Sequence, residues 1–134
     1  MNIYGLCTLE HGIATLEFMD GRVPLRGIIG LSERKATDAV SGYMHLQEYC
    51  DQNNLEFISM DNYSFNKEGD KEKLLKLKVD LVFILGWQRL VPDWFIEHCA
   101  YGVIGVHGST QGITAGRGRS PQNWALIMGG RQFE

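Results

Sequence analysis

The segment that most constrains the fold is residues 80–86, with the sequence DLVFILG. Its apolar residues follow one another without the polar alternation of a half-exposed strand, a pattern typical of a strand buried on both faces. Strands of that kind occur in parallel sheets that helices cover on both sides. The run therefore predicts an α/β fold with a buried strand here.

The rest of the chain supplies the other elements of such a fold. Further strands are expected near residues 3–7, 25–30, 55–59 and 102–107, and helices near 11–19, 44–52, 71–78, 92–98 and 120–129. Because strands alternate with helices, we predict a doubly wound, mostly parallel sheet with helices on both faces, in one domain spanning residues 1–134. Residues 132–134 look like the start of a further strand, so we expect this domain to be incomplete at its C-terminal end.

Charge and composition exclude several classes of protein. The net charge of −3 gives no electrostatic footprint for nucleic acid or for an anionic membrane. No apolar run approaches the roughly 18 residues of a membrane span, and the N-terminus has no signal-peptide pattern, so we expect a cytoplasmic protein. The three cysteines, Cys7, Cys50 and Cys99, form no CxxC pair and are expected to be free thiols. No histidines and acidic residues have metal-ligand spacing, so we expect no metal.

In doubly wound sheets, ligands bind at the carboxyl ends of the strands. The turn after the first predicted strand has neither a GxGxxG nor a Walker A pattern, which disfavours a dinucleotide site there. His11 and Gly12 in this turn are candidates for lining the crevice. The alternative interpretation is that they form the solvated start of a helix.

His107 differs from the other histidines because it follows an apolar strand and opens a loop of small and polar residues. An imidazole at that position suits general acid–base catalysis, or donation of a proton to an oxyanion. The alternative is a structural histidine that caps the strand by hydrogen bonding. His45 and His98 lie on predicted helices, and we expect structural or solvated roles for both.

A glycine- and arginine-rich segment precedes the last predicted helix. Arg117, Gly118 and Arg119 combine flexible backbone with guanidinium donors beside a helix start, which together suit an anion or carboxylate. The alternative is a plain surface turn.

Three blocks of the sequence resemble those of a known family: DLVFILGWQRLVPDWFI, GVIGVHGS and GRGRSPQNWALIMGG. Together they resemble the folate-dependent formyltransferases of the methionyl-tRNA, glycinamide-ribonucleotide and sugar-nucleotide types. The likeness covers about fifty residues closely, and the whole chain in its order of elements. It implies the Rossmann-like formyltransferase fold and attack of a substrate amine on the formyl carbon of 10-formyltetrahydrofolate, with no metal.

The resemblance also implies roles for particular residues. His107 would stabilise the oxyanion of the tetrahedral intermediate, a task that needs fixed donors in a dry crevice. The turn within the first block would meet the pterin, largely through its backbone; it consists of Gly86, Trp87, Gln88, Arg89 and Leu90. The Arg117–Arg119 loop would border both ligands.

The chain departs from the family pattern in three places. Gly105 stands where the family has an asparagine donor, the loop after His107 is about two residues longer than in the tRNA-directed enzymes, and the family's orienting aspartate would fall beyond Glu134. Ser109 or Asn123 could replace the missing donor, although Asn123 could equally lie on a helix surface. We therefore expect the 134-residue chain to be inactive or very weak on its own.

The segment RGRSPQNW resembles the corresponding segment of the sugar-nucleotide N-formyltransferases more than that of the tRNA type. The absence of a basic surface agrees, since tRNA binding would call for one. We therefore expect a small-molecule amine substrate on a sugar nucleotide, no nucleic acid or membrane partner, and a homodimer formed through the incomplete edge. Two other hypotheses stay open: a non-catalytic ligand-binding or interaction module with the same fold, and an unrelated doubly wound domain such as the nucleotide-binding half of a glycosyltransferase.

Overall fold

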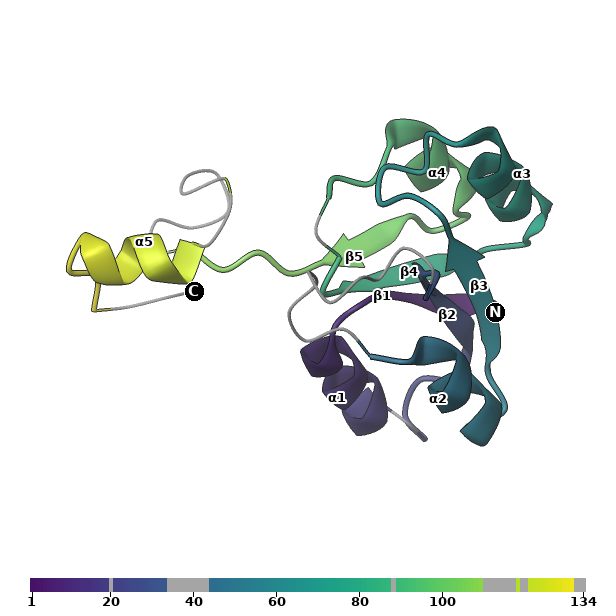
Figure 1. Ribbon diagram of the computed structural model, residues 1–134, viewed down its shortest axis with the longest axis horizontal. Coiled ribbons are helices and arrows are strands. Elements are labelled where there is room, and N and C mark those ends of the chain that lie inside the picture. Colours follow the sequence, from purple (N-terminus) through teal and green to yellow (C-terminus); the bar gives the residue numbers. More distant parts are fainter. Residues whose placement is uncertain (20, 34–43, 88, 110–117, 119–120, 132–134) are drawn as a thin grey trace.

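A computed structural model describes residues 1–19, 21–33, 44–87, 89–109, 118 and 121–131. In this part of the chain, strands and helices alternate as the sequence predicts (Figure 1). The strands are β1 (Ile3–Cys7), β2 (Leu25–Leu31), β3 (Glu56–Met60), β4 (Leu81–Leu85) and β5 (Val103–Gly105). The helices are α1 (Glu10–Met19), α2 (Leu46–Gln52), α3 (Glu68–Lys76), α4 (Asp93–His98) and α5 (Pro121–Ile127).

The strands form one sheet in the order β3-β2-β1-β4-β5, and every neighbouring pair is parallel. The chain builds the sheet outward from β1 through β2 to β3, then crosses back to place β4 on the other side of β1. The predicted doubly wound α/β fold is confirmed. The reversal also creates a switch point between β1 and β4, where ligands bind in such sheets.

Helices cover both faces of the sheet (Figure 1). α3 and α4 pack on one face over a large apolar cluster that contains Leu6, Val82 and Phe95. α1 and α2 pack on the other face over a second cluster that contains Ile13, Ile28 and Leu46. Successive residues of a strand point to opposite faces, so β1 supplies side chains to both clusters, and all five of its residues are buried.

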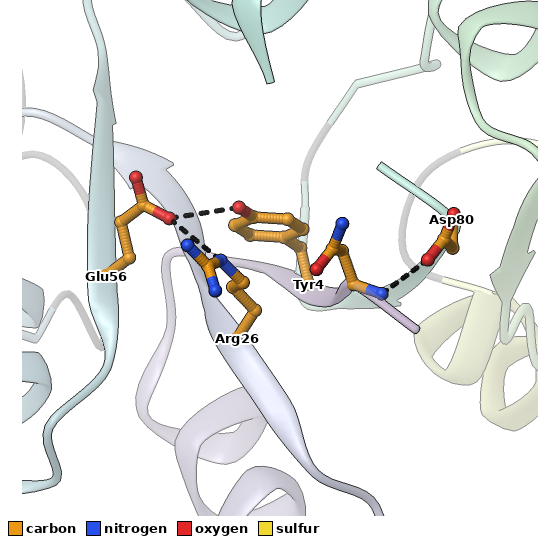
Figure 2. Close-up of polar contacts among 5 residues, drawn as sticks. Tyr4, Arg26, Glu56 and Asp80 are labelled. Atoms are coloured by element: carbon orange, nitrogen blue, oxygen red, sulfur yellow. Dashed lines mark hydrogen bonds and ion pairs between the residues drawn. The ribbon is translucent and has the colours of Figure 1, made fainter. Parts of the chain in front are cut away.

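Polar contacts join the strands at their amino ends (Figure 2). The buried Tyr4 hydroxyl donates a hydrogen bond of 3.0 Å to Glu56 Oε2 on β3, and Arg26 Nε on β2 lies 3.7 Å from the same oxygen. The backbone N–H of Asn2 donates to the Asp80 carboxylate just before β4. Burial, together with the Glu56 carboxylate, raises the pKa of Tyr4. These contacts hold four strands in register at the edge opposite the switch point.

The predicted boundaries differ from the observed ones in two instructive places. β5 was expected to reach residue 107, but its pairing with β4 ends at Gly105, which lies beside Ile84. α3 begins at Glu68, earlier than expected, and the buried Asp70 carboxylate in its first turn accepts the backbone N–H of Asp61 at 2.9 Å. The predicted loop around residues 110–117 and the expected strand at 132–134 lie outside the described residues.

All three cysteines are buried free thiols, as predicted. Burial raises the pKa of Cys7 to about 11, of Cys50 to about 12 and of Cys99 to about 11. The thiolate is the reactive form of cysteine, so these side chains are chemically inert at neutral pH.

α5 stands apart from the rest of the molecule. Figure 1 shows it beyond the end of β5, clear of both helical layers. Among the described residues, it makes no extended contact with any other helix or strand. Its apolar side chains are therefore largely exposed, including Trp124 at 59%.

Candidate active site at the carboxyl ends of the strands

The switch point brings together two residues that the sequence analysis had assigned to one crevice. His11 lies in the first turn of α1, directly after β1, and Gly86 directly follows β4. Gly86 has a φ of 89°, and a Cβ atom added there would lie 2.8 Å from His11 Nε2. Because β1 and β4 are neighbours, the His11 imidazole and the Gly86 backbone meet at the mouth of the switch point. Glycine is required at this turn for both conformation and space.

Gly12 explains why α1 approaches the sheet so closely. A Cβ atom on Gly12 would lie 2.0 Å from the Leu85 carbonyl oxygen and 2.4 Å from Cys7 Sγ. The first turn of α1 therefore rests directly on the last residue of β4. Gly12 is buried, so its contribution to the site is to hold His11 in place by close packing.

The Trp87 indole points into the core. It is 8% exposed, and its Nε1 donates a hydrogen bond of 3.0 Å to the Tyr63 carbonyl oxygen. Its ring centroid lies 4.8 Å from that of Tyr63 and 5.4 Å from that of Phe65. Trp87 thus anchors the turn after β4 to the core, and its indole does not face solvent.

The other residues predicted to meet the pterin divide into two groups. The Arg89 and Leu90 side chains are exposed, Leu90 almost completely, at 94%. Gln88 lies outside the described residues. The turn consequently offers its backbone and two outward-pointing side chains on its solvent side.

Two polar side chains that the sequence analysis did not single out lie at the same edge. The Thr8 hydroxyl directly follows β1, and the Tyr63 hydroxyl belongs to the segment after β3; both are buried. Burial raises the pKa of Tyr63, while the nearby Thr8 hydroxyl and Arg89 lower it. Although Thr8 is close enough to have this effect, neither hydroxyl has a hydrogen-bond partner of acceptable geometry among the described residues. The two hydroxyls are therefore close neighbours with no hydrogen bond between them.

His107 follows β5 by two residues and is exposed, and Ser109 is buried two residues further on. β5 lies next to β4, so both residues leave the sheet from the strand beside the Gly86 turn. Asn123 is exposed on α5, which stands apart from the sheet. Of the two candidate replacement donors, Ser109 is therefore the one that stays next to His107.

The remaining predicted residues of the site give less information. Arg117 and Arg119 lie outside the described residues, and Gly118 between them has a φ of 120°. Among the described residues, no group of three or more histidine, cysteine, aspartate or glutamate side chains could hold a metal ion. Within the same residues, none of the helices has the length and apolar character to cross a membrane.

The structural roles expected for two other histidines are observed. The His45 Nδ1 lies 3.1 Å from a Glu33 carboxylate oxygen at the start of α2, where both side chains are exposed. The His98 Nε2 lies 2.9 Å from the Leu77 carbonyl oxygen, and its ring stacks on Phe95. Neither of these contacts involves His11 or Gly86 at the switch point.

Methionyl-tRNA formyltransferases are similar to this chain in sequence. The methionyl-tRNA formyltransferase of Koribacter versatilis is 33% identical over 64 residues, which are 48% of this chain and 20% of that protein. The methionyl-tRNA formyltransferase of Clostridium novyi is 25% identical over 131 residues, covering 96% of this chain and 41% of that protein. No family model matches the chain.

A solved structure has the same fold as this chain. Glycinamide ribonucleotide transformylase 1 from Symbiobacterium toebii superposes with a TM-score of 0.64 at 22% identity, over 96% of this chain and 61% of that one. The chain is thus similar in sequence to methionyl-tRNA formyltransferases and similar in fold to a glycinamide ribonucleotide transformylase. It spans less than half the length of the curated formyltransferases that it matches. At this identity the solved formyltransferase structure establishes the fold.

Proposed function

We propose that the chain is the folate-binding and catalytic part of a cytoplasmic formyltransferase, which transfers the formyl group of 10-formyltetrahydrofolate to the amine of a sugar nucleotide. The observation that carries this proposal is the close approach of His11 to Gly86 at the switch point, beside the strand that leads to His107. His11, the turn after β4 and His107 thus follow three adjacent strands. The family likeness assigns the last two to one reaction, and the switch-point rule adds His11. The net charge of −3 gives no basic footprint of the kind that tRNA binding calls for, which supports a small-molecule substrate.

In the proposed reaction, the amine nitrogen attacks the formyl carbon and a tetrahedral intermediate forms. His107 donates a hydrogen bond to the oxygen that gains negative charge, and the attacking nitrogen loses a proton to a base. The C=O bond then re-forms as the bond between the formyl carbon and the folate nitrogen breaks, and the folate nitrogen takes up a proton as it leaves. Gly105 supplies no side-chain donor, so Ser109, buried close to His107, takes the place of the second oxyanion donor. The backbone of the turn after β4 holds the pterin.

The first test measures binding, because it does not depend on turnover. Titration of the 134-residue chain with a reduced folate should show saturable binding. Gly86→Ala should weaken it at least tenfold, because the new Cβ would lie 2.8 Å from His11 Nε2 in the crevice. Gly102→Ala is the matched control: Gly102 also has a positive φ, of 86°, but nothing lies within 4 Å of its Cβ position.

The second test measures transfer from 10-formyltetrahydrofolate to a panel of amino-sugar nucleotides, glycinamide ribonucleotide and methionyl-tRNA. A version continued past Glu134 should be active on a sugar nucleotide, and His107→Gln should remove that activity while His45→Gln retains it. Strong turnover by the 134-residue chain would show that the essential groups are elsewhere. A continued version that binds folate but transfers nothing would favour a non-catalytic binding module.

A further inference from the structure

Two neighbouring hydroxyls at the carboxyl edge of the sheet are buried and unused. Neither the Thr8 nor the Tyr63 hydroxyl has a hydrogen-bond partner among the described residues. A buried polar group without a partner lowers stability, and native proteins contain few of them. The third such atom in the described part of the chain is an Asp70 carboxylate oxygen, but the other oxygen of that carboxylate accepts the backbone N–H of Asp61. In Thr8 and Tyr63, by contrast, the whole polar group of the side chain is without a partner.

Both hydroxyls lie on the face of the sheet that α3 and α4 cover. Tyr4 and Leu6 of β1 belong to the apolar cluster on that face, and side chains alternate along a strand, so Thr8 points the same way. The Tyr63 ring packs against the same cluster, with its centroid 4.8 Å from that of Trp87. α1 packs on the opposite face (Figure 1). The hydroxyl pair is therefore separate from the cluster beneath α1.

Tyr63 is held in place by a tight turn. The Asn62 Oδ1 accepts hydrogen bonds from the Ser64 N–H at 2.8 Å and from the Ser64 Oγ at 2.7 Å, and Phe65 closes the turn with a φ of 57°. The Tyr63 carbonyl oxygen accepts the Trp87 Nε1 at 3.0 Å. These bonds do not involve the Tyr63 hydroxyl. A group held in position in this way binds a ligand at a lower entropic cost.

The neighbouring groups indicate the chemistry of the missing partner. Burial raises the pKa of Tyr63, whereas the Thr8 hydroxyl and the Arg89 cation lower it. Arg89 is thus the charged group that acts on this hydroxyl, and it is exposed. A guanidinium donates hydrogen bonds but accepts none, and both hydroxyls are able to donate. The three groups together suit an oxygen that carries negative charge.

We propose that the Thr8 and Tyr63 hydroxyls bind a phosphoryl oxygen of the amine substrate, with Arg89 on the solvent side of the same phosphoryl group. This subsite rests on the proposed function, because the phosphate belongs to the nucleotide part of that substrate. A tetrahedral phosphoryl group presents one oxygen to the buried pair and another to the guanidinium. Both hydroxyl oxygens are closed to solvent in this structure, so entry of the phosphoryl oxygen requires a local opening on the exposed side, beside Arg89.

The test is a calorimetric titration of the 134-residue chain with inorganic pyrophosphate, which should bind saturably. Tyr63→Phe and Thr8→Val each remove one hydroxyl and keep the shape of the side chain, and each should weaken binding at least tenfold. Arg89→Gln should weaken binding and make it less sensitive to salt. Tyr4→Phe is the matched control, since it removes a buried tyrosine hydroxyl at the opposite edge of the sheet; it should leave the affinity for pyrophosphate unchanged.

Thermal denaturation in the absence of pyrophosphate separates a binding role from a structural one. Tyr63→Phe should unfold at the wild-type temperature or above it, because the hydroxyl has no partner among the described residues. Tyr4→Phe should unfold at a lower temperature, because it loses the hydrogen bond to Glu56. Weaker pyrophosphate binding at full stability in Tyr63→Phe assigns the hydroxyl to the ligand. If Tyr63→Phe lowers the unfolding temperature as Tyr4→Phe does, the hydroxyl has a partner within the chain and the proposal fails.

A reduced folate carries carboxylates but no phosphate, and it distinguishes this subsite from the proposed function. Saturating reduced folate should leave the affinity for pyrophosphate unchanged, because the two ligands occupy different parts of the crevice. Displacement of pyrophosphate by folate would assign the pair to a folate carboxylate and overturn the proposal. Wild-type affinity in Tyr63→Phe, or a chain that binds folate but no pyrophosphate, would overturn it as well and leave the folate site standing. Pyrophosphate binding with the expected variant pattern but no folate binding would retain the anion subsite and reject the proposed function.

Discussion

Replacing Gly12 with alanine tests the packing that builds the switch point. The Cβ atom would lie 2.0 Å from the Leu85 carbonyl oxygen and 2.4 Å from Cys7 Sγ. The cysteine side chain could adjust, but the carbonyl belongs to the backbone of β4, so α1 would have to move outward. Overpacking of this kind costs about 1–3 kcal/mol, and the better helix propensity of alanine returns up to about 1 kcal/mol. We therefore expect Gly12→Ala to lower the free energy of unfolding by about 1–2 kcal/mol.

Gly69→Ala is the matched control, because it makes the same change near the start of another helix. Nothing lies within 4 Å of a Cβ at Gly69, so propensity acts alone and stability should rise by about 0.5 kcal/mol. Urea denaturation followed by circular dichroism measures both free energies. The two variants should shift stability in opposite directions. If Gly12→Ala is as stable as the native chain, or follows Gly69→Ala, then α1 is not pressed against β4 and the argument for the His11 position fails.

Four further predictions concern side chains described above. Tyr63→Phe should leave the free energy of unfolding unchanged or raise it by up to about 1 kcal/mol in thermal denaturation, because it removes a buried hydroxyl that has no hydrogen-bond partner among the described residues. Tyr4→Phe should lower it by about 0.5–1.5 kcal/mol in the same assay through loss of the hydrogen bond to β3, and a neutral result would contradict that role. Burial raises the pKa of Cys7 to about 11 and of Cys50 to about 12, against 9.0 for an ordinary thiol, so the unfolded chain loses these protons first. The free energy of unfolding should therefore keep its maximum value below pH 9.0 and fall as pH rises toward 11. A free energy of unfolding that does not change with pH over this range in urea titrations would refute this. Gly105→Asn should fold normally, because its Cβ would meet Ile84 at an ordinary 3.5 Å. In a version continued past Glu134 it should raise formyl transfer by adding a donor to the one that Ser109 supplies, and lower activity would mean that no space for a further donor exists there.

The sheet could be predicted because each strand carries its own signal. The predicted strand at residues 80–86 contains the unbroken apolar run LVFIL, and this run is the observed β4, Leu81–Leu85. β5 shows the opposite case. The apolar sequence continues past Gly105, but pairing stops one residue before the end of β4, so Val106 is left without a strand neighbour. Local pattern indicates a strand, whereas its end is the point where pairing with the neighbouring strand stops.

The site could be predicted only in outline. The switch-point rule places His11 and Gly86 at one edge because it depends on topology, which alternating elements reveal. The inward direction of the Trp87 indole depends on Tyr63, 24 residues away in sequence, and no periodicity encodes that contact. The separation of α5 from the other described helices and strands is likewise not encoded in its periodicity, although its helical character is evident from the sequence.

The central place of β1 has a consequence for synthesis on the ribosome. β1 is made first, yet one of its two edges pairs with β4, the fourth strand to be made. Once β3 has ended at Met60, another 25 residues must be added before β4 ends at Leu85. At roughly 5–20 residues per second, the nascent chain carries an open edge on its innermost strand for about 1–5 seconds. An unpaired edge is a template for wrong pairing, so slower translation of residues 61–80 would lengthen the period in which nascent chains can associate through β1.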